Sequence, residues 1–273
     1  MPNIRNYWMP NVEQAKKTQG RLLDSTHTLI AKTRAAYNIF TDFLKDRTGH
    51  IPKIAYIGHS SLDPLYHFGD QPLPPQSFTN VFHAYGHAGT KGTGALIKCW
   101  LRHPEWPTLS VLGNSNSEYN IGQSNNIKMI SKVSINELGI IQRASAIHVY
   151  PTSREGFGHA LNEARGSGAL LVATDFGPMN EFVQEGYSGY LMKIDSENVE
   201  SFQLFGTLRP VQVRMNSNDI CNGMEKVFKT SMADRIRMGE AGRAGFLADR
   251  LYFTEMVKIL KNEALRRFNG EEL

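Results

Sequence analysis

The sequence contains little cysteine and no long apolar run. Of its 273 residues only Cys99 and Cys221 are cysteines, and their spacing fits no metal site. We therefore expect two reduced, buried thiols rather than a disulfide, which favours a reducing compartment. No stretch approaches the roughly 20 apolar residues of a transmembrane span, and the first residues have no apolar signal core. These absences predict a cytoplasmic protein, with a position at a membrane surface left open.

Charge of one sign is also scarce. The net charge is +4, and the chain has neither the arginine-rich run nor the basic stripe interleaved with aromatics that is typical of nucleic-acid-binding proteins. We expect no nucleic-acid partner. His103 and His148 have no second ligand at helical spacing, so we expect no metal. No Gly-x-Gly-x-x-Gly segment follows a first strand with an acid about 20 residues later, which argues against a dinucleotide-dependent dehydrogenase.

Short apolar runs alternate with helical patterns through the middle of the chain. We expect strands at 78–85, 108–112, 126–130, 146–150, 169–174 and 190–194, with helices at 92–103, 135–143, 158–167 and 179–185. This alternation predicts parallel βαβ units in a Rossmann-like, doubly wound α/β sheet. Residues 197–215 are expected to form an irregular connection. Residues 216–268 are expected to be helical, with breaks around Ser231 and near Asp249.

Two carboxylates flank a predicted strand-to-helix turn, in Glu155-Gly-Phe-Gly-His-Ala-Leu-Asn-Glu163. Gly156 and Gly158 allow the backbone to approach a ligand closely, and the free N–H groups at the start of the helix suit a diphosphate. Glu163 can accept hydrogen bonds from a ribose diol while Glu155 faces an attached sugar. The turn is therefore predicted to hold a sugar nucleotide.

This segment resembles the E-x7-E motif of retaining GT-B glycosyltransferases, and the resemblance covers roughly residues 50 to 260. Asp175-Phe-Gly-Pro-Met-Asn-Glu181 is similar to the family's next loop, and Gly186-Tyr-Ser-Gly-Tyr-Leu191 to the entry of the following strand. Upstream, Tyr85-Gly-His-Ala-Gly-Thr-Lys91-Gly-Thr resembles the loop that binds the diphosphate in the family. The combined order of these motifs is far more specific than any single motif.

The resemblance implies a metal-free donor site without a cofactor. Lys91 and Glu155 would be the catalytic residues: the lysine stabilises the leaving diphosphate, and the glutamate contacts the donor sugar rather than acting as a nucleophile. His87 stands where the family has arginine, so a diphosphate contact and a structural role both stay open for it. His159 and Glu181 also have structural alternatives at helix starts. The implied donor-binding positions are Gly86, His87, Lys91, Gly113, Asn114, Lys132, Val133, Gly156, Phe157, Gly158, His159, Glu163 and Glu181.

The resemblance also implies three parts. Residues 1–55 are similar to only the last two βα units of the family's acceptor domain, and a complete domain would need about 100 more residues. Residues 56–215 would form the donor-binding, Rossmann-like domain. Residues 216–273 would be helices that pack on this domain and cross back.

Three functions are compatible with these features. The first is retaining transfer of a sugar from a nucleoside diphosphate sugar to a hydroxyl of a glycan, lipid or protein, driven by positioning and electrostatics. The second is the donor-binding half of a split glycosyltransferase, completed by a partner chain that supplies an N-terminal domain. The third is a non-catalytic domain that binds nucleotide sugars. A homodimer also stays open, since an apolar face on the partial front domain could drive it.

Overall fold

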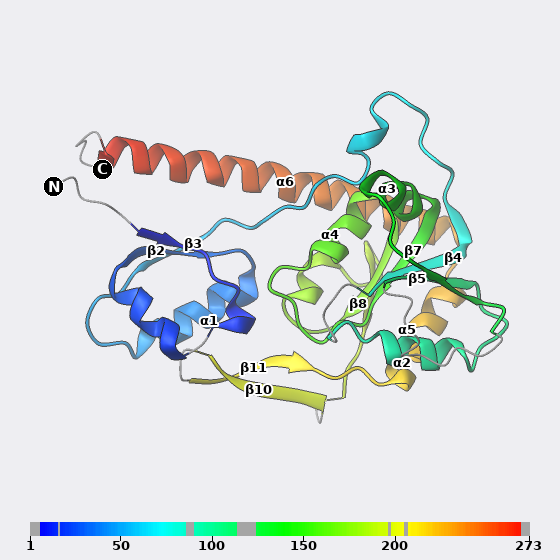
Figure 1. Ribbon diagram of the computed structural model, residues 1–273, viewed down its shortest axis with the longest axis horizontal. Coiled ribbons are helices and arrows are strands. Elements are labelled where there is room, and N and C mark those ends of the chain that lie inside the picture. Colours follow the sequence, from blue (N-terminus) through cyan, green and yellow to red (C-terminus); the bar gives the residue numbers. More distant parts are fainter. Residues whose placement is uncertain are drawn as a thin grey trace. The chain divides into compact units, whose positions relative to one another are not determined.

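The computed structural model describes residues 6–15, 17–85, 90–113, 124–195, 198–204 and 207–268. The chain forms two compact units, which are described in turn (Figure 1). The smaller unit comprises residues 1–60, 201–211 and 248–273, and the larger unit comprises residues 61–200 and 212–247. The division into 1–55, 56–215 and 216–273 stays a prediction.

The larger unit is built on a six-stranded sheet in which every neighbouring pair is parallel. The strand order is β6-β5-β4-β7-β8-β9, so the chain winds outward from β4 in one direction and from β7 in the other. The strands are β4 (Ser77–Ala84), β5 (Thr108–Leu112), β6 (Ile127–Ile130), β7 (Ser145–Tyr150), β8 (Leu170–Thr174) and β9 (Gly189–Met192). The predicted doubly wound α/β sheet is confirmed, with its strands close to their expected positions.

Helices cover both faces of this sheet because successive side chains of a strand point to opposite faces. Along β7, Ile147 and Val149 belong to the core shared with helices α2 (Thr93–Trp100) and α5 (Ser217–Lys229). Tyr150 packs on the other face with Leu161 of helix α4 (His159–Gly166). Helix α3 (Ile135–Ala144) precedes β7, and the unit also includes two 3-10 helices, η3 (Tyr66–Phe68) and η4 (Met179–Phe182).

The helix expected over 179–185 is only the short 3-10 helix η4. The helix cannot continue because the chain turns back just after η4. The N–H groups of Tyr187 and Ser188 donate to Gln184 O, and Gly186, which lies between Gln184 and Tyr187, adopts a positive φ of 71°. Glycine tolerates this conformation, which most other residues avoid.

The smaller unit contains a three-stranded parallel sheet in the order β1-β2-β3. Its core includes Leu23, Leu29 and Phe40, all fully buried. Thr33 begins helix α1 by accepting a hydrogen bond from the N–H of Ala36, as N-cap threonines do. The elements are β1 (Asn6–Trp8), η1 (Val12–Gln14), η2 (Lys17–Asp24), β2 (Thr26–Ala31), α1 (Arg34–Lys45) and β3 (Lys53–Tyr56). The expected N-terminal α/β segment is thus confirmed.

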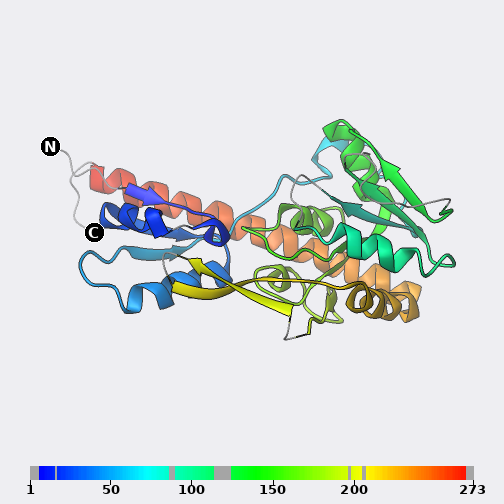
Figure 2. The same cartoon turned by 60° about the horizontal axis from the view of Figure 1, so that its bottom comes forward.

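Two expectations for the rest of the chain are wrong. The segment expected to be irregular forms a two-stranded sheet of β10 (Val199–Leu204) and β11 (Thr207–Val213), whose valine, leucine and phenylalanine content favours strands (Figure 2). Helix α6 (Met232–Phe268) begins after the expected break at Ser231, but it continues through Asp249 without a second break. The residues after Asp249 include neither proline nor glycine until position 270, so nothing local stops the helix.

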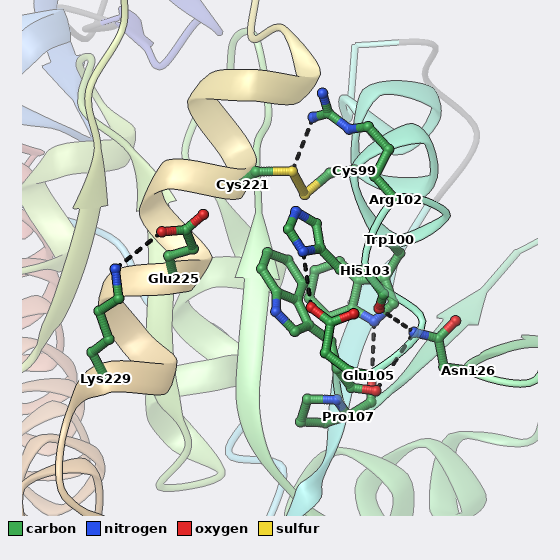
Figure 3. Close-up of polar contacts among 11 residues, drawn as sticks. Cys99, Trp100, Arg102, His103, Glu105, Pro107, Asn126, Cys221, Glu225 and Lys229 are labelled. Atoms are coloured by element: carbon green, nitrogen blue, oxygen red, sulfur yellow. Dashed lines mark hydrogen bonds and ion pairs between the residues drawn. A yellow bond between two sulfur atoms is a disulfide. The ribbon is translucent and has the colours of Figure 1, made fainter.

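The expectation of two reduced thiols is also wrong, because Cys99 and Cys221 form a disulfide (Figure 3). Their Cα atoms are 5.6 Å apart although 122 positions separate them in sequence. Helices α2 and α5 pack side by side on one face of the sheet, which brings the two residues together. Arg102 donates to Cys221 Sγ at 3.0 Å and to Asn218 Oδ1 at 2.7 Å. A contact between two helices this distant in sequence leaves no signal in cysteine spacing.

The disulfide removes the reason given above for a reducing compartment. Within the described residues, no helix combines the length and apolar character needed to cross a bilayer.

Reduction of the Cys99–Cys221 disulfide should lower the free energy of unfolding. A cross-link over so long a loop restricts the unfolded chain, by about 4–5 kcal/mol in the loop-entropy model. Urea unfolding with and without dithiothreitol measures the loss. The Cys99→Ala/Cys221→Ala double variant is the control, since its stability should not respond to the reductant. Labelling of two free thiols in the native, unreduced protein would contradict the bond.

Candidate functional site

The turn after β4 and the turn after β7 meet at the centre of the larger unit's sheet. β4 and β7 are hydrogen-bonded neighbours, but the chain winds away from them in opposite directions. The connections therefore diverge at this point, and α/β proteins bind ligands beyond the carboxyl ends of such central strands. Lys91 follows β4 and Glu155 follows β7, so the fold brings both to the same edge.

The two turns contact each other directly through their backbones. The N–H of Ser153 donates to Thr90 O at 2.7 Å, and the hydroxyl of Thr152 lies 3.2 Å from the same oxygen. Gly92 lies against Pro151: a Cβ at position 92 would stand only 2.2 Å from the Pro151 carbonyl oxygen. Gly92 also has a positive φ of 69°. Glycine is required here for two reasons, and residues 90–92 pack directly against residues 151–153.

Lys91 and Glu155 form an ion pair where these two turns meet. Lys91 Nζ lies 2.5 Å from Glu155 Oε1, and the two side chains are only 18% and 11% exposed. The hydroxyl of Thr152, a buried residue, donates to the same carboxylate oxygen at 3.0 Å. Thr152 is itself held from β8, since the hydroxyl of Thr174 donates to Thr152 O at 2.9 Å. The two residues predicted to be catalytic are therefore in contact.

Two helices begin at this edge with glycine N-caps. Gly92 precedes α2 and Gly158 precedes α4, both in left-handed conformations, and neither helix has a capping hydrogen bond from an N-cap side chain. The first N–H groups of a helix lack partners within the helix and carry partial positive charge. Both helix starts can thus attract an anion bound between them.

His83 fixes the first residue of α2 to the sheet. Its Nδ1 lies 2.8 Å from Val149 O, and its Nε2 lies 2.8 Å from the hydroxyl oxygen of Thr93. Because the ring is fully buried, desolvation lowers the pKa of His83 to about 4, so the ring is neutral at pH 7. A carbonyl only accepts, so Nδ1 carries the proton and Nε2 accepts from Thr93. This network holds the helix that follows Lys91.

Glu163 lies on α4 with its carboxylate largely buried. Gln142 of α3 donates its side-chain amide to Glu163 Oε2 at 3.0 Å. Burial raises the pKa of Glu163, and the bond from Gln142 opposes that shift. The hydroxyl of Tyr150 lies within electrostatic reach of both glutamates: burial chiefly raises the pKa of this phenol, and the charges of Glu163 and Glu155 raise it further. Tyr150 therefore stays protonated.

The other predicted positions fall at the same sheet edge where they are described. Gly113 follows β5 and packs on Tyr85, whose Cβ would be 2.8 Å from a Cβ at position 113. Lys132 and Val133 follow β6, and Glu181 lies exposed in η4 beyond β8. His159 Nδ1 is 2.9 Å from Ser61 Oγ. Gly86, His87 and Asn114 lie outside the described residues, and Gly156 and Phe157 belong to the turn before α4.

Three residues of this region were not predicted from the sequence. They are Thr152, which holds Glu155, Gln142, which holds Glu163, and Tyr150, which lies near both glutamates. Gln142 left a faint signal. It is a polar residue in the last turn of a predicted helix, at a position expected to face the core. Thr152 and Tyr150 left none, since either is ordinary at the end of a strand.

Comparison with known proteins supports the predicted family. Residues 114–204, a third of the chain, match the family model described as glycosyl transferases group 1. The GtfA subunit of the UDP-N-acetylglucosamine–peptide N-acetylglucosaminyltransferase of Streptococcus gordonii is 26% identical in an alignment of 188 positions that covers 65% of this chain and 36% of the subunit. This chain therefore spans little more than a third of that relative's length.

Solved structures show the fold. A GtfA/B complex superimposes with a TM-score of 0.69 at 19% identity, over 95% of this chain and 53% of that chain. The pneumococcal O-GlcNAc transferase GtfA, in complex with UDP and GlcNAc, gives 0.63 at 20% identity, over 92% and 47%. The Rossmann-like fold of GT-B glycosyltransferases, predicted from the sequence, is confirmed.

Replacing Gly92 by alanine should destabilise the larger unit more than replacing Gly186. Both glycines have positive φ, but a Cβ at 186 would meet nothing within 4 Å. Gly186→Ala should cost about 1 kcal/mol through backbone strain alone. Gly92→Ala adds the collision with Pro151 O and should cost about 3 kcal/mol or more. Equal losses in urea unfolding would show that the contact between the two turns contributes nothing.

Proposed function

We propose that this chain is a group 1 glycosyltransferase that takes a sugar from a nucleoside diphosphate donor and transfers it, with retention, to a hydroxyl group. Its relatives suggest the first substrates to test: UDP-N-acetylglucosamine as the donor and a peptide hydroxyl as the acceptor. The proposal assumes no metal and no cofactor.

The observation that carries this proposal is the contact between Lys91 and Glu155 at the two central strands. A cation, a carboxylate and two glycine-capped helix starts lie at one sheet edge. A diphosphate needs the cation and the helix starts, and an attached sugar needs an acceptor for its hydroxyl protons. The arrangement offers both.

In this proposal the chain acts by positioning and electrostatics. Lys91 and the N–H groups of α2 and α4 offset the charge that develops on the leaving diphosphate. Glu155 is held by Lys91 and Thr152, so it serves as a fixed acceptor for sugar hydroxyls rather than as a nucleophile. Glu163 accepts hydrogen bonds from the ribose. The acceptor hydroxyl attacks on the face from which the diphosphate leaves and passes its proton to the departing phosphate oxygen.

Lys91→Met should lower the affinity for UDP about 10- to 100-fold, the effect of one lost charge-assisted contact of roughly 1.5–3 kcal/mol. Glu155→Gln should bind UDP at least as tightly as the wild type, because Lys91 no longer shares its charge with a carboxylate, yet it should lose sugar transfer. Isothermal titration and a transfer assay with and without EDTA measure both effects.

Lys229→Met is the matched control, since Lys229 pairs with Glu225 on the exposed face of α5 (Figure 3). Unchanged UDP binding in Lys91→Met would count against the proposed diphosphate site.

A second candidate is the donor-binding half of a split glycosyltransferase. One observation favours it: one of the similar structures is a complex of two proteins. In this reading a partner chain completes the acceptor side. The third candidate, a domain that binds nucleotide sugars without catalysis, predicts binding but no transfer under any condition.

Transfer assays distinguish these candidates. The purified chain, incubated with UDP-N-acetylglucosamine and a serine-rich peptide, should release UDP and glycosylate the peptide if the first candidate holds. The split candidate predicts donor binding without turnover until a partner chain is added. Turnover by the chain alone, lost in Glu155→Gln, would exclude both the split and the non-catalytic candidates.

A further inference from the structure

Helix α3 exposes two apolar side chains and buries a polar one, the reverse of what a surface helix usually does. Its apolar residues Ile135 and Ile140 are 61% and 47% exposed, whereas Gln142 is only 3% exposed. Gly139 is the other buried residue of the helix. A buried amide is unfavourable unless it is hydrogen-bonded, so a leucine or methionine at position 142 would serve the packing better. The glutamine must therefore have a role other than packing.

The amide of Gln142 is hydrogen-bonded to one carboxylate. Its Nε2 donates to Glu163 Oε2 at 3.0 Å, while its backbone oxygen lies 3.0 Å from Nε2 of the buried His148 on β7. The opposite end of α3 is fixed by a capping box between Ser134 and Glu137. Both ends of the helix are thus anchored, which fixes the backbone that carries the Gln142 side chain.

The orientation of the Glu163 carboxylate depends on the Gln142 amide. Among the described residues only Gln142 bonds to it, at Oε2, so Oε1 is left for a ligand. Burial disfavours the ionised form, and the hydrogen bond from Gln142 favours it. A carboxylate held by one oxygen presents the other in a defined direction, as a site that recognises a ligand hydroxyl requires.

We propose that Gln142 is a positioning residue for the donor, which orients Glu163 so that its carboxylate recognises the ribose diol. This inference rests on the proposed function, and it assigns to α3 a part in selecting ribonucleotide donors. Its specific consequence is discrimination: a 2′-deoxyribonucleotide lacks one hydroxyl of the diol and should bind less well only while Glu163 is correctly oriented.

The experiment compares UDP with 2′-deoxy-UDP by isothermal titration of the full chain. The wild type should prefer UDP about tenfold, and Glu163→Ala should bind the two nucleotides alike. Gln142→Met, which keeps the volume but loses the donor, should reduce the preference to about twofold or less. Gln142→Glu tests the same point with an isosteric side chain, which places a second carboxylate against Glu163 and should also abolish the preference.

Gln76→Leu is the matched control. Gln76 also donates its amide at 3.0 Å, but to the backbone oxygen of Gly168 rather than to Glu163. Its loss should leave the preference for UDP unchanged, although it can lower stability. A ratio of two affinities is unaffected by a uniform loss of folded protein, so a merely structural role for Gln142 would not alter it.

The outcomes separate the inference from the function on which it rests. If Glu163→Ala loses the preference and both Gln142 variants retain it, the positioning role is wrong and the donor site stands. If the wild type binds neither nucleotide, or binds both equally, the assignment of Glu163 to the ribose fails and the role of Gln142 fails with it. Loss of the preference in Glu163→Ala and in both Gln142 variants supports the inference.

Discussion

The candidate site depends on the parallel pairing of β4 with β7. Val81 pairs with Ile147 and Phe82 with His148, although 66 residues separate the members of each pair in sequence. Because the strands are neighbours and parallel, the turns that follow them end at one sheet edge. The backbone contact between Thr90 and Ser153, and then the ion pair of Lys91 with Glu155, become possible only once this pairing exists.

Three sets of hydrogen bonds between buried groups support the sheet edge beneath the site. His83 connects β7 to the start of α2, Thr152 connects the β7 turn to Glu155, and Gln142 connects α3 to Glu163. Each of these hydrogen bonds fixes the orientation of the groups that it joins. Ligand-binding side chains supported in this way need little reorganisation when a ligand arrives.

The sequence sufficed for the α/β class, the six strands of the larger unit's sheet, and the sheet edge that carries Lys91 and Glu155. Apolar runs alternating with helical patterns specify parallel units, and glycines beside Lys91 and Glu155 mark close backbone approaches. The sequence could not show what depends on tertiary contacts between distant segments: the disulfide, the pairing of Lys91 with Glu155, and the glutamine beneath Glu163. The β10–β11 sheet was missed for another reason, since Gly206 and Pro210 are residues typical of loops and stand among the strand-forming residues of this segment.

The disulfide closes residues 99 to 221 into a covalent ring. This ring includes β5 to β9, the turn with Glu155, and the strands β10 and β11. A protease that cuts one peptide bond anywhere inside the ring cannot release either fragment while the bond is oxidised. Lys91 and α5 would then remain in one molecule after such a nick, so an intact mass on a non-reducing gel says nothing about whether the chain between them is unbroken.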